Sequence, residues 1–447
     1  MKTKLKQYLF LIASVFLVAG AVKAQEEQST FNLDQAIRYA MENSYVLQNT
    51  SQDVTIAQKQ VWEAISTGLP QVSGSANYNW FLNLPVSLIP GEFFGGEPGT
   101  YIPVKFGQDF NSDFGLRVNQ LIFDGSYIVG VGSAQLYVDL AKQTFEKTEI
   151  DIRDAVTQAY YMVLISIRYK EVMQDSYDNT KELYDETKIY FENGLRESQD
   201  VDQLKILLKN AENEMLRSDR ELEVARIVLK YTMGYPLDST IQLTDNIESF
   251  VLPLVQEQNT YQLDLASHID YRLANSNFQV SEKLLNLEKV AYLPSLSGFY
   301  SYTRTAYSNN ANLFKEKWFP SSLVGFQATI PIFNSGMKRS RVQQAKIELD
   351  KAAINKILTE RTLQKDYLTA KAEMQTARER FLNDRENRDL AQSILEKSQI
   401  KFNNGMISSA ELSQQESQYI SAFQSMVTST LQLLQADLNL KKASGAL

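Results

Sequence analysis

Apolar and polar residues alternate in four short stretches of the 447-residue chain. In the first stretch, Val72, Ala76 and Trp80 share one side, and small polar residues occupy the other. A period of two predicts β-strands, because successive strand side chains point to opposite faces of a sheet. In the third stretch, Phe299 is an exception, because it lies on the side that is otherwise polar. We expect the four strands at about 70–80, 113–123, 294–303 and 323–333.

A period of three to four residues replaces the alternation after the second strand of each half. Residues 126–192 and 337–403 each continue for 67 residues without proline, and their apolar positions have the narrow spacing of a coiled-coil seam. Gly194 and Gly405 follow these stretches, and glycine commonly ends a helix. We expect two antiparallel helical hairpins, 126–232 and 337–445, and shorter helices at 33–67 and 263–293.

The two halves of the chain share landmarks in the same order. Leu69-Pro70 returns as Leu293-Pro294, Ile122-Phe123 as Ile332-Phe333, and Asn193-Gly194 as Asn404-Gly405. Such self-similarity predicts a tandem repeat of one structural unit. We place the first repeat at 25–232, the second at 261–447, and a connector at 233–260.

The N-terminus has the features of a secretory signal. Lysines precede an apolar stretch from Leu9 to Ala21, and a small-residue cleavage site ends at Ala24. A membrane anchor is the alternative, but the apolar stretch is short for spanning a bilayer. We therefore predict that residues 1–24 are a signal peptide.

Composition excludes several classes of protein. The chain has no cysteine, so the exported protein has no disulfide and no lipid attached to cysteine. Its net charge of −8 argues against general binding of nucleic acid, which requires a basic face.

The strands have the length needed to cross a bilayer when they are tilted. An ordinary sheet packed on helices is the alternative, but small polar residues on one face suit a water-filled lumen. Four strands are too few to close a barrel, so copies must associate; two copies give eight strands and three give twelve. The polar lumen favours three. The predicted lumen residues are Ser73, Ser75, Asn77, Arg117, Asn119, Gln327 and Thr329.

Several motifs carry a resemblance to a known family. They are LDQAIRYAMEN from Leu33, QLIFDG from Gln120, FNNGMISSAEL from Phe402 and LNLKKASGAL from Leu438. In their order and spacing the chain resembles the TolC-like outer-membrane efflux proteins of Gram-negative bacteria. The resemblance implies a mainly α fold with a β-barrel portion, in which a homotrimer completes a twelve-stranded barrel and a helical coiled-coil tunnel extends into the periplasm.

The resemblance also implies a function and partners. Such trimers meet a periplasmic adaptor (a membrane fusion protein) and an inner-membrane pump of the RND or ABC type. They form the exit duct of a tripartite efflux or type I secretion system for drugs, toxic solutes or polypeptides. No catalysis, cofactor or metal is implied.

The resemblance places the helix turns at the periplasmic tip. Residues expected to contact the adaptor are Gly194, Leu195, Arg196, Gly405, Met406 and Ile407. Glu411, Gln414 and Asp200 are the candidate pore gate, where Gln414 would make a second ring neutral. The two acids have an alternative interpretation as first-turn residues favoured by the helix dipole.

Two other classes of protein fit the sequence less well. An enzyme has little support, because the single histidine, His268, is expected within a helix, and no phosphate loop or nucleophile motif is present. A non-conducting exported coiled-coil adhesin or scaffold would explain the helices and the signal peptide. It does not explain four strands of bilayer length.

Overall fold

The computed structural model describes residues 30–256 and 261–447, so the predicted signal peptide lies outside the described part. The chain forms two compact units, and each takes segments from both halves of the sequence. Of the described residues, the helical unit comprises 30–48, 148–256, 261–263 and 365–447, and the strand unit comprises 49–147 and 264–364. The compact units therefore do not coincide with the predicted repeats, whose boundaries stay a prediction.

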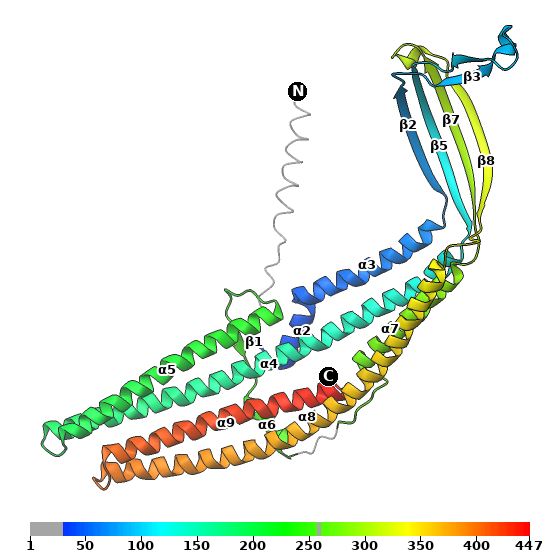
Figure 1. Ribbon diagram of the computed structural model, residues 1–447. Coiled ribbons are helices and arrows are strands. Elements are labelled where there is room, and N and C mark those ends of the chain that lie inside the picture. Colours follow the sequence, from blue (N-terminus) through cyan, green and yellow to red (C-terminus); the bar gives the residue numbers. More distant parts are fainter. Residues whose placement is uncertain (1–29, 257–260) are drawn as a thin grey trace, which may run out of the picture. The chain divides into compact units, whose positions relative to one another are not determined.

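A four-stranded antiparallel sheet forms most of the β structure in the strand unit (Figure 1). Its strands, in spatial order, are β2 (Gln71–Trp80), β5 (Phe110–Phe123), β7 (Ser295–Ser308) and β8 (Phe319–Thr329). The predicted strands are present, but β5 and β7 are longer than expected. β8 ends earlier than expected, before Pro331, which has no N–H to donate to a neighbouring strand.

The segment between β2 and β5 is rich in proline, glycine and aromatic residues, which predicts an irregular surface loop, but the structure differs. It contains a hairpin of β3 (Val86–Pro90) and β4 (Tyr101–Lys105), with the short 3₁₀ helix η1 (Gly91–Phe94) between them. Pro90 ends β3 and Pro103 lies within β4. The sequence did not predict these strands, because proline is tolerated in a strand only where its missing N–H donor is not needed.

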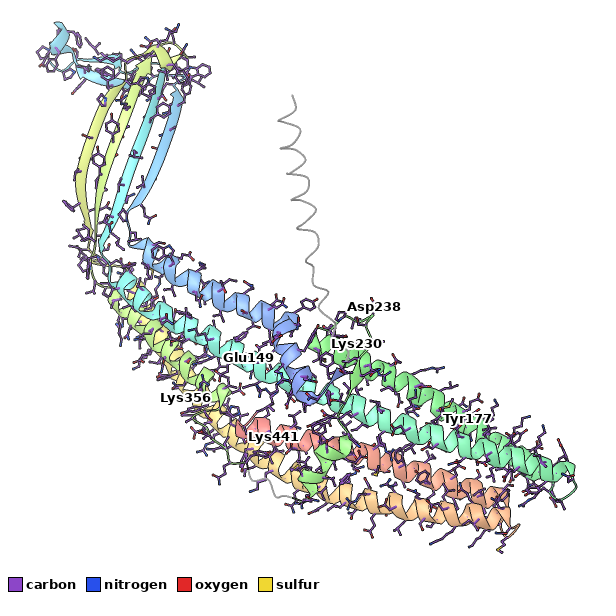
Figure 2. The ribbon with its side chains drawn as sticks, turned by 180° about the vertical axis from the view of Figure 1, so that it is seen from behind. Glu149, Tyr177, Lys230, Asp238, Lys356 and Lys441 are labelled. Carbon is purple, nitrogen blue, oxygen red and sulfur yellow. The ribbon has the colours of Figure 1, made fainter. Side chains whose placement is uncertain are left out.

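The helices of the strand unit run side by side. α4 (Gly125–Glu192) begins here and α7 (Ile269–Val290) lies against it, since Arg272 makes a paired contact with Glu146 at 2.6 and 2.9 Å. Lys356, labelled in Figure 2, donates to Asn275 and so ties α8 (Met337–Asn403) to α7. α7 begins later than predicted. His268 is its N-cap and not an interior residue, because its Nδ1 accepts from the backbone N–H of Asp270.

The first predicted helix is broken in two. α2 (Leu33–Asn43) ends at Ser44, which has an extended backbone, and α3 (Tyr45–Thr67) follows. Asn32 and Gln35 form a capping box at the start of α2. The break lies against Gly234, which ends α5 (Ser198–Met233) in left-handed geometry.

The helical unit contains α4 from residue 148 onward and α8 from residue 365 onward, together with α5 and α9 (Ser409–Ser444). The long helices end within a residue of their predicted positions. The connector has more structure than its polar sequence suggests: β6 (Gln242–Leu243) pairs in parallel with β1 (Thr30–Phe31), and α6 (Ile247–Gln256) packs into the core beside α9. Lys230, labelled in Figure 2, holds the connector by donating to backbone carbonyls of Leu237 and Ser239.

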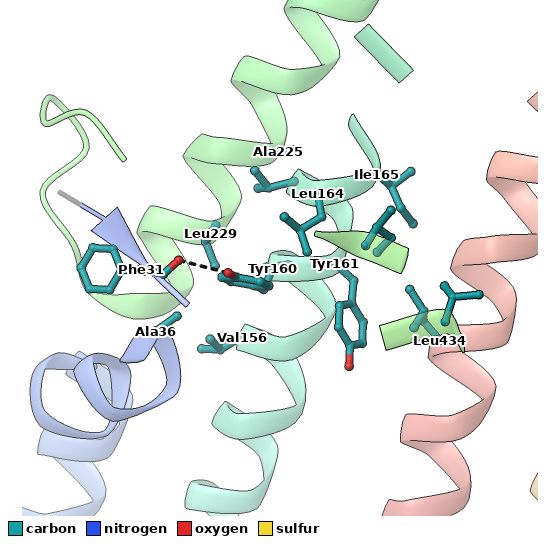
Figure 3. Packing of buried hydrophobic residues seen from close by; sticks show 14 of the residues in the cluster. Phe31, Ala36, Val156, Tyr160, Tyr161, Leu164, Ile165, Ala225, Leu229 and Leu434 are labelled. Carbon is teal, nitrogen blue, oxygen red and sulfur yellow. Dashed lines mark hydrogen bonds between the residues drawn. The ribbon is translucent and has the colours of Figure 1, made fainter. Parts of the chain in front are cut away.

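Tyr160 of α4 lies at the centre of the helical unit's main core (Figure 3). Its side chain is fully buried, and its hydroxyl donates to the carbonyl of Phe31 at 3.0 Å and to Asp245 at 2.9 Å. Asp245 also accepts from the backbone N–H of Leu33, the first residue of α2. This cluster therefore joins the N-terminal segment, α4 and the connector at one point.

Candidate channel wall and helix tips

Register places all the predicted lumen residues on one face of the sheet. Ser73 pairs with Arg117 and Arg117 with Ser301, while Gln327 pairs with Ser297. Residues directly opposite each other in a ladder share a face, and so do residues two apart in one strand. The face is mostly polar, although Leu121 and Leu323 also lie on it. Asn77 donates to Asp113 at 2.8 Å, and Asn79 donates to Asn111 at 2.8 Å.

Phe299 lies on this polar face, as the sequence pattern implied, and the structure explains how it is accommodated. It is directly opposite Gly325, and a Cβ added at that glycine would come within 2.7 Å of the Phe299 ring. The guanidinium of Arg117 lies 4.7 Å from the ring centroid, within the range of a cation–π contact. The space at Gly325 and the contact with Arg117 thus accommodate the Phe299 ring on a polar face.

The other face of the sheet is apolar. Val72, Val118, Tyr300 and Val324 form one row across all four strands. Val72 and Val324 are largely exposed in the single chain. A sheet with an exposed apolar face and a polar face opposite it fits a wall between lipid and water.

The two helix turns in the helical unit have the same local geometry. Gly194 and Gly405 both have φ of +73°, and the preceding asparagine of each turn donates to a carbonyl four residues earlier at 2.8 Å. Leu195 and Met406, which follow the glycines, are each 71% exposed. Each turn therefore presents one apolar side chain to the surroundings.

Two residues predicted to contact an adaptor have partners inside the chain. The Arg196 guanidinium lies 4.4 Å from the Phe402 ring centroid and also donates to the Phe402 carbonyl. Ile407 packs on the apolar cluster that contains Phe402 and, from the other hairpin, Leu204. Arg196 and Ile407 thus join one turn to the other hairpin, which leaves Leu195 and Met406 as the more accessible pair.

The candidate gate residues have different environments. Glu411 and Gln414 are exposed on α9, and the backbone N–H of Glu411 donates to its N-cap, Ser408. Asp200 instead accepts a hydrogen bond from the buried Ser409 hydroxyl at 2.7 Å. Asp200 therefore links the two hairpins, while its predicted role in a pore remains a prediction.

A buried carboxylate near the tips was not anticipated from the sequence. Glu416 is 7% exposed and accepts from the hydroxyls of Ser176 at 2.9 Å and Thr180 at 2.8 Å, both on α4. Burial raises the pKa of its carboxyl, although the two hydroxyl donors oppose the rise. The sequence signal for this burial was the position of Glu416 between Leu412 and Phe423, which are apolar residues of the same buried seam.

Known proteins share the sequence pattern and the fold of this chain. The model of the outer membrane efflux protein family matches residues 36–235 and 260–446. The chain belongs to this family. Members of the outer membrane efflux family are transport channels of the outer membrane. Among the curated proteins, no sequence matches this efflux protein.

Solved structures share the fold of the efflux protein. CusC is 16% identical, with 92% of this chain and 91% of CusC covered and a TM-score of 0.71. The open state of the Neisseria gonorrhoeae channel MtrE is 16% identical, with coverage of 93% and 89% and a TM-score of 0.70. The Campylobacter jejuni channel CmeC is 17% identical, with coverage of 93% and 86% and a TM-score of 0.69.

Two further observations bear on chemistry and membrane insertion. Within residues 30–256 and 261–447, no three His, Asp or Glu side chains are placed to hold a metal ion. No helix in the same part of the chain has the length and apolarity required to cross a membrane.

The buried Glu416 predicts a pH-dependent stability. A raised pKa means that the folded state favours the protonated carboxyl. The stability that this preference contributes is complete below the ordinary pKa of 4.5 and is lost as pH rises through the folded pKa. Glu416→Gln keeps an oxygen acceptor for Ser176 and Thr180 without the charge. We expect it to stabilise the efflux protein by about 1 kcal/mol at neutral pH and by less near pH 4.

Thermal unfolding of wild type and Glu416→Gln across this pH range measures the effect. Glu411→Gln, which changes an exposed carboxylate on the same helix, is the control and should not stabilise the protein at neutral pH. Parallel profiles for wild type and Glu416→Gln would contradict the assignment.

Proposed function

We propose that three copies of this efflux protein close a twelve-stranded barrel in the outer membrane and form the exit duct of a tripartite efflux or type I secretion system. The observation that carries the proposal is the sheet with one polar and one apolar face. Its two edge strands, β2 and β8, each have one partner among the described residues. An open edge in lipid leaves backbone groups unsatisfied, so each edge needs a strand from another copy.

The polar face of the sheet favours three copies over two. Eight strands leave an interior that side chains fill, whereas a larger barrel leaves space for water. The polar face carries Arg117, Asn77 and Asp113, whose charged and amide groups require hydration or partners. A trimer satisfies these groups with water, and the described four strands per chain then give twelve.

The remaining partners are proposed from family membership and from the exposed turns. An adaptor that presents an apolar groove would take up Leu195 and Met406, which are equally exposed and follow glycines with the same φ of +73°. The adaptor would connect the duct to an inner-membrane pump of the RND or ABC type. The energy for export would come from that pump, and the duct itself would need no cofactor.

The mass of the detergent-extracted protein tests the proposal. Light scattering, with the detergent contribution subtracted, should give three mature chains, and the same preparation should form conducting channels in planar bilayers. A monomer that conducts no ions would contradict the duct and would favour the coiled-coil scaffold.

Charge at the proposed gate should affect ion selectivity. A ring of carboxylates favours cations, so Glu411→Lys is expected to shift the reversal potential toward anion selectivity, and Gln414→Glu is expected to shift it toward cations. Asp200→Asn, at the third candidate, is expected to have a smaller effect, since Asp200 is bound to Ser409. The assignment fails if Asp200→Asn changes the selectivity and Glu411→Lys does not.

A further inference from the structure

The β3–β4 hairpin presents an apolar tip that has no covering element among the described residues. Phe93 is 79% exposed and Phe94 is 63% exposed. The tip nevertheless has an ordered backbone: Gly91 donates to the Thr100 carbonyl at 2.7 Å, and Gly96 donates back to the Gly91 carbonyl at 2.9 Å. A rigid tip with exposed rings loses little conformational entropy on binding, which favours a docking surface.

The charges on this hairpin and on the β7–β8 connection have opposite signs. The tip carries Glu92 and Glu97, and neither forms an ion pair within the described part of the chain. Residues 309–318, between β7 and β8, carry Lys315 and Lys317, which are exposed and similarly without a carboxylate partner there. Glu316 between them accepts from Ser308 at 2.9 Å, so the two lysines leave this connection basic.

The basic connection also has an apolar centre and a fixed backbone. Phe314 is 89% exposed, whereas its neighbour Leu313 is 4% exposed and anchors the turn. The side chain of Asn312 accepts from the Phe314 backbone N–H at 3.2 Å. The connection thus resembles the hairpin tip, since it has an exposed ring beside charges, but its charges have the opposite sign.

Strand direction places both surfaces at the same end of the sheet. β2 ends at Trp80, and β8 begins at Phe319 at that end. The hydroxyl of Tyr78 donates to the Ala311 carbonyl at 3.0 Å, so the basic connection extends over β2. The β3–β4 hairpin lies beyond the β8 side of the sheet in both ribbon views (Figures 1 and 2).

We propose that the β3–β4 hairpin of one copy docks on residues 309–318 of the next copy at the outer mouth of the barrel. The proposal rests on the proposed trimer, in which β8 of one copy pairs with β2 of the next. A hairpin that projects past β8 then extends over β2 of the next copy, where the basic connection lies. Glu92 and Glu97 face Lys315 and Lys317 of the next copy, and the exposed rings of the two segments are removed from water.

The absence of cysteine in the native chain permits a direct test by cross-linking. Glu97→Cys and Lys315→Cys are placed on separate chains that carry different tags, the two chains are co-expressed, and the purified protein is treated with a short bismaleimide. We expect two-chain products that carry both tags. Each single-cysteine variant expressed alone is the control and should give at least tenfold less two-chain product.

Charge reversal provides a second measurement. Glu92→Lys with Glu97→Lys should lower the temperature at which the detergent-extracted trimer dissociates, and adding Lys315→Glu with Lys317→Glu should restore it. Lys105→Glu, at the base of the same hairpin, is the control and should have a smaller effect. If the variant with all four substitutions does not regain the dissociation temperature of the wild-type trimer, the charge pairing is overturned.

The two proposals fail in different ways. If scattering shows a trimer but the mixed cysteine pair gives no two-chain product, the hairpin does not dock on the next copy, and a lipid headgroup or another protein covers it. If the wild type is a monomer, the barrel itself is overturned.

Discussion

Tyr160→Ala is expected to lower the free energy of unfolding of the helical unit by about 3–5 kcal/mol, the range for removing a buried aromatic side chain. The side chain is fully buried among α2, α4 and α5 (Figure 3), so its loss leaves a cavity. It also leaves Asp245 and the Phe31 carbonyl without the hydroxyl donor. Chemical denaturation of the detergent-solubilised protein, followed by circular dichroism, measures the loss.

Tyr160→Phe separates the cavity from the hydrogen bonds. It keeps the ring, and Asp245 still accepts from Leu33, so we expect a cost of about 1–2 kcal/mol. Equal losses for the two variants would show that the hydroxyl, and not the packing of the ring, holds the N-terminal segment.

Gly234→Ala is expected to destabilise the protein by about 3 kcal/mol or more through a steric conflict with backbone atoms. A Cβ at Gly234 would lie 2.5 Å from the Asn43 carbonyl oxygen and 2.9 Å from its carbon, where α2 ends. Backbone atoms cannot move aside as a flexible side chain can. Hydrogen exchange of α2, together with the denaturation midpoint, measures the effect.

Gly405→Ala is the matched control. Gly405 has φ of +73° against +72° for Gly234, but a Cβ there has no atom within 4 Å. Its cost should be the left-handed backbone alone, about 1–2 kcal/mol. Similar losses at both glycines would mean that the contact with Asn43 relaxes at no cost.

The candidate site was only partly predictable from sequence. The polar face was predictable, because alternation depends only on the period of a strand. The partners of Arg196 and Asp200 were not predictable, since Phe402 and Ser409 are about two hundred residues away in the chain. Both residues had been expected to face an adaptor or a pore, whereas Leu195 and Met406 project freely.

The sequence by itself determined the elements whose causes are local. The absence of proline and the glycines at positions 194 and 405 determined where the long helices run and turn, and alternation determined the four strands. Tertiary structure decided the rest. The break at Ser44 lies against Gly234, and Phe299 is accommodated by Gly325 on the neighbouring strand. Glu416 is buried where α4 covers it. These outcomes depend on residues that are distant in sequence, so no local pattern could contain them.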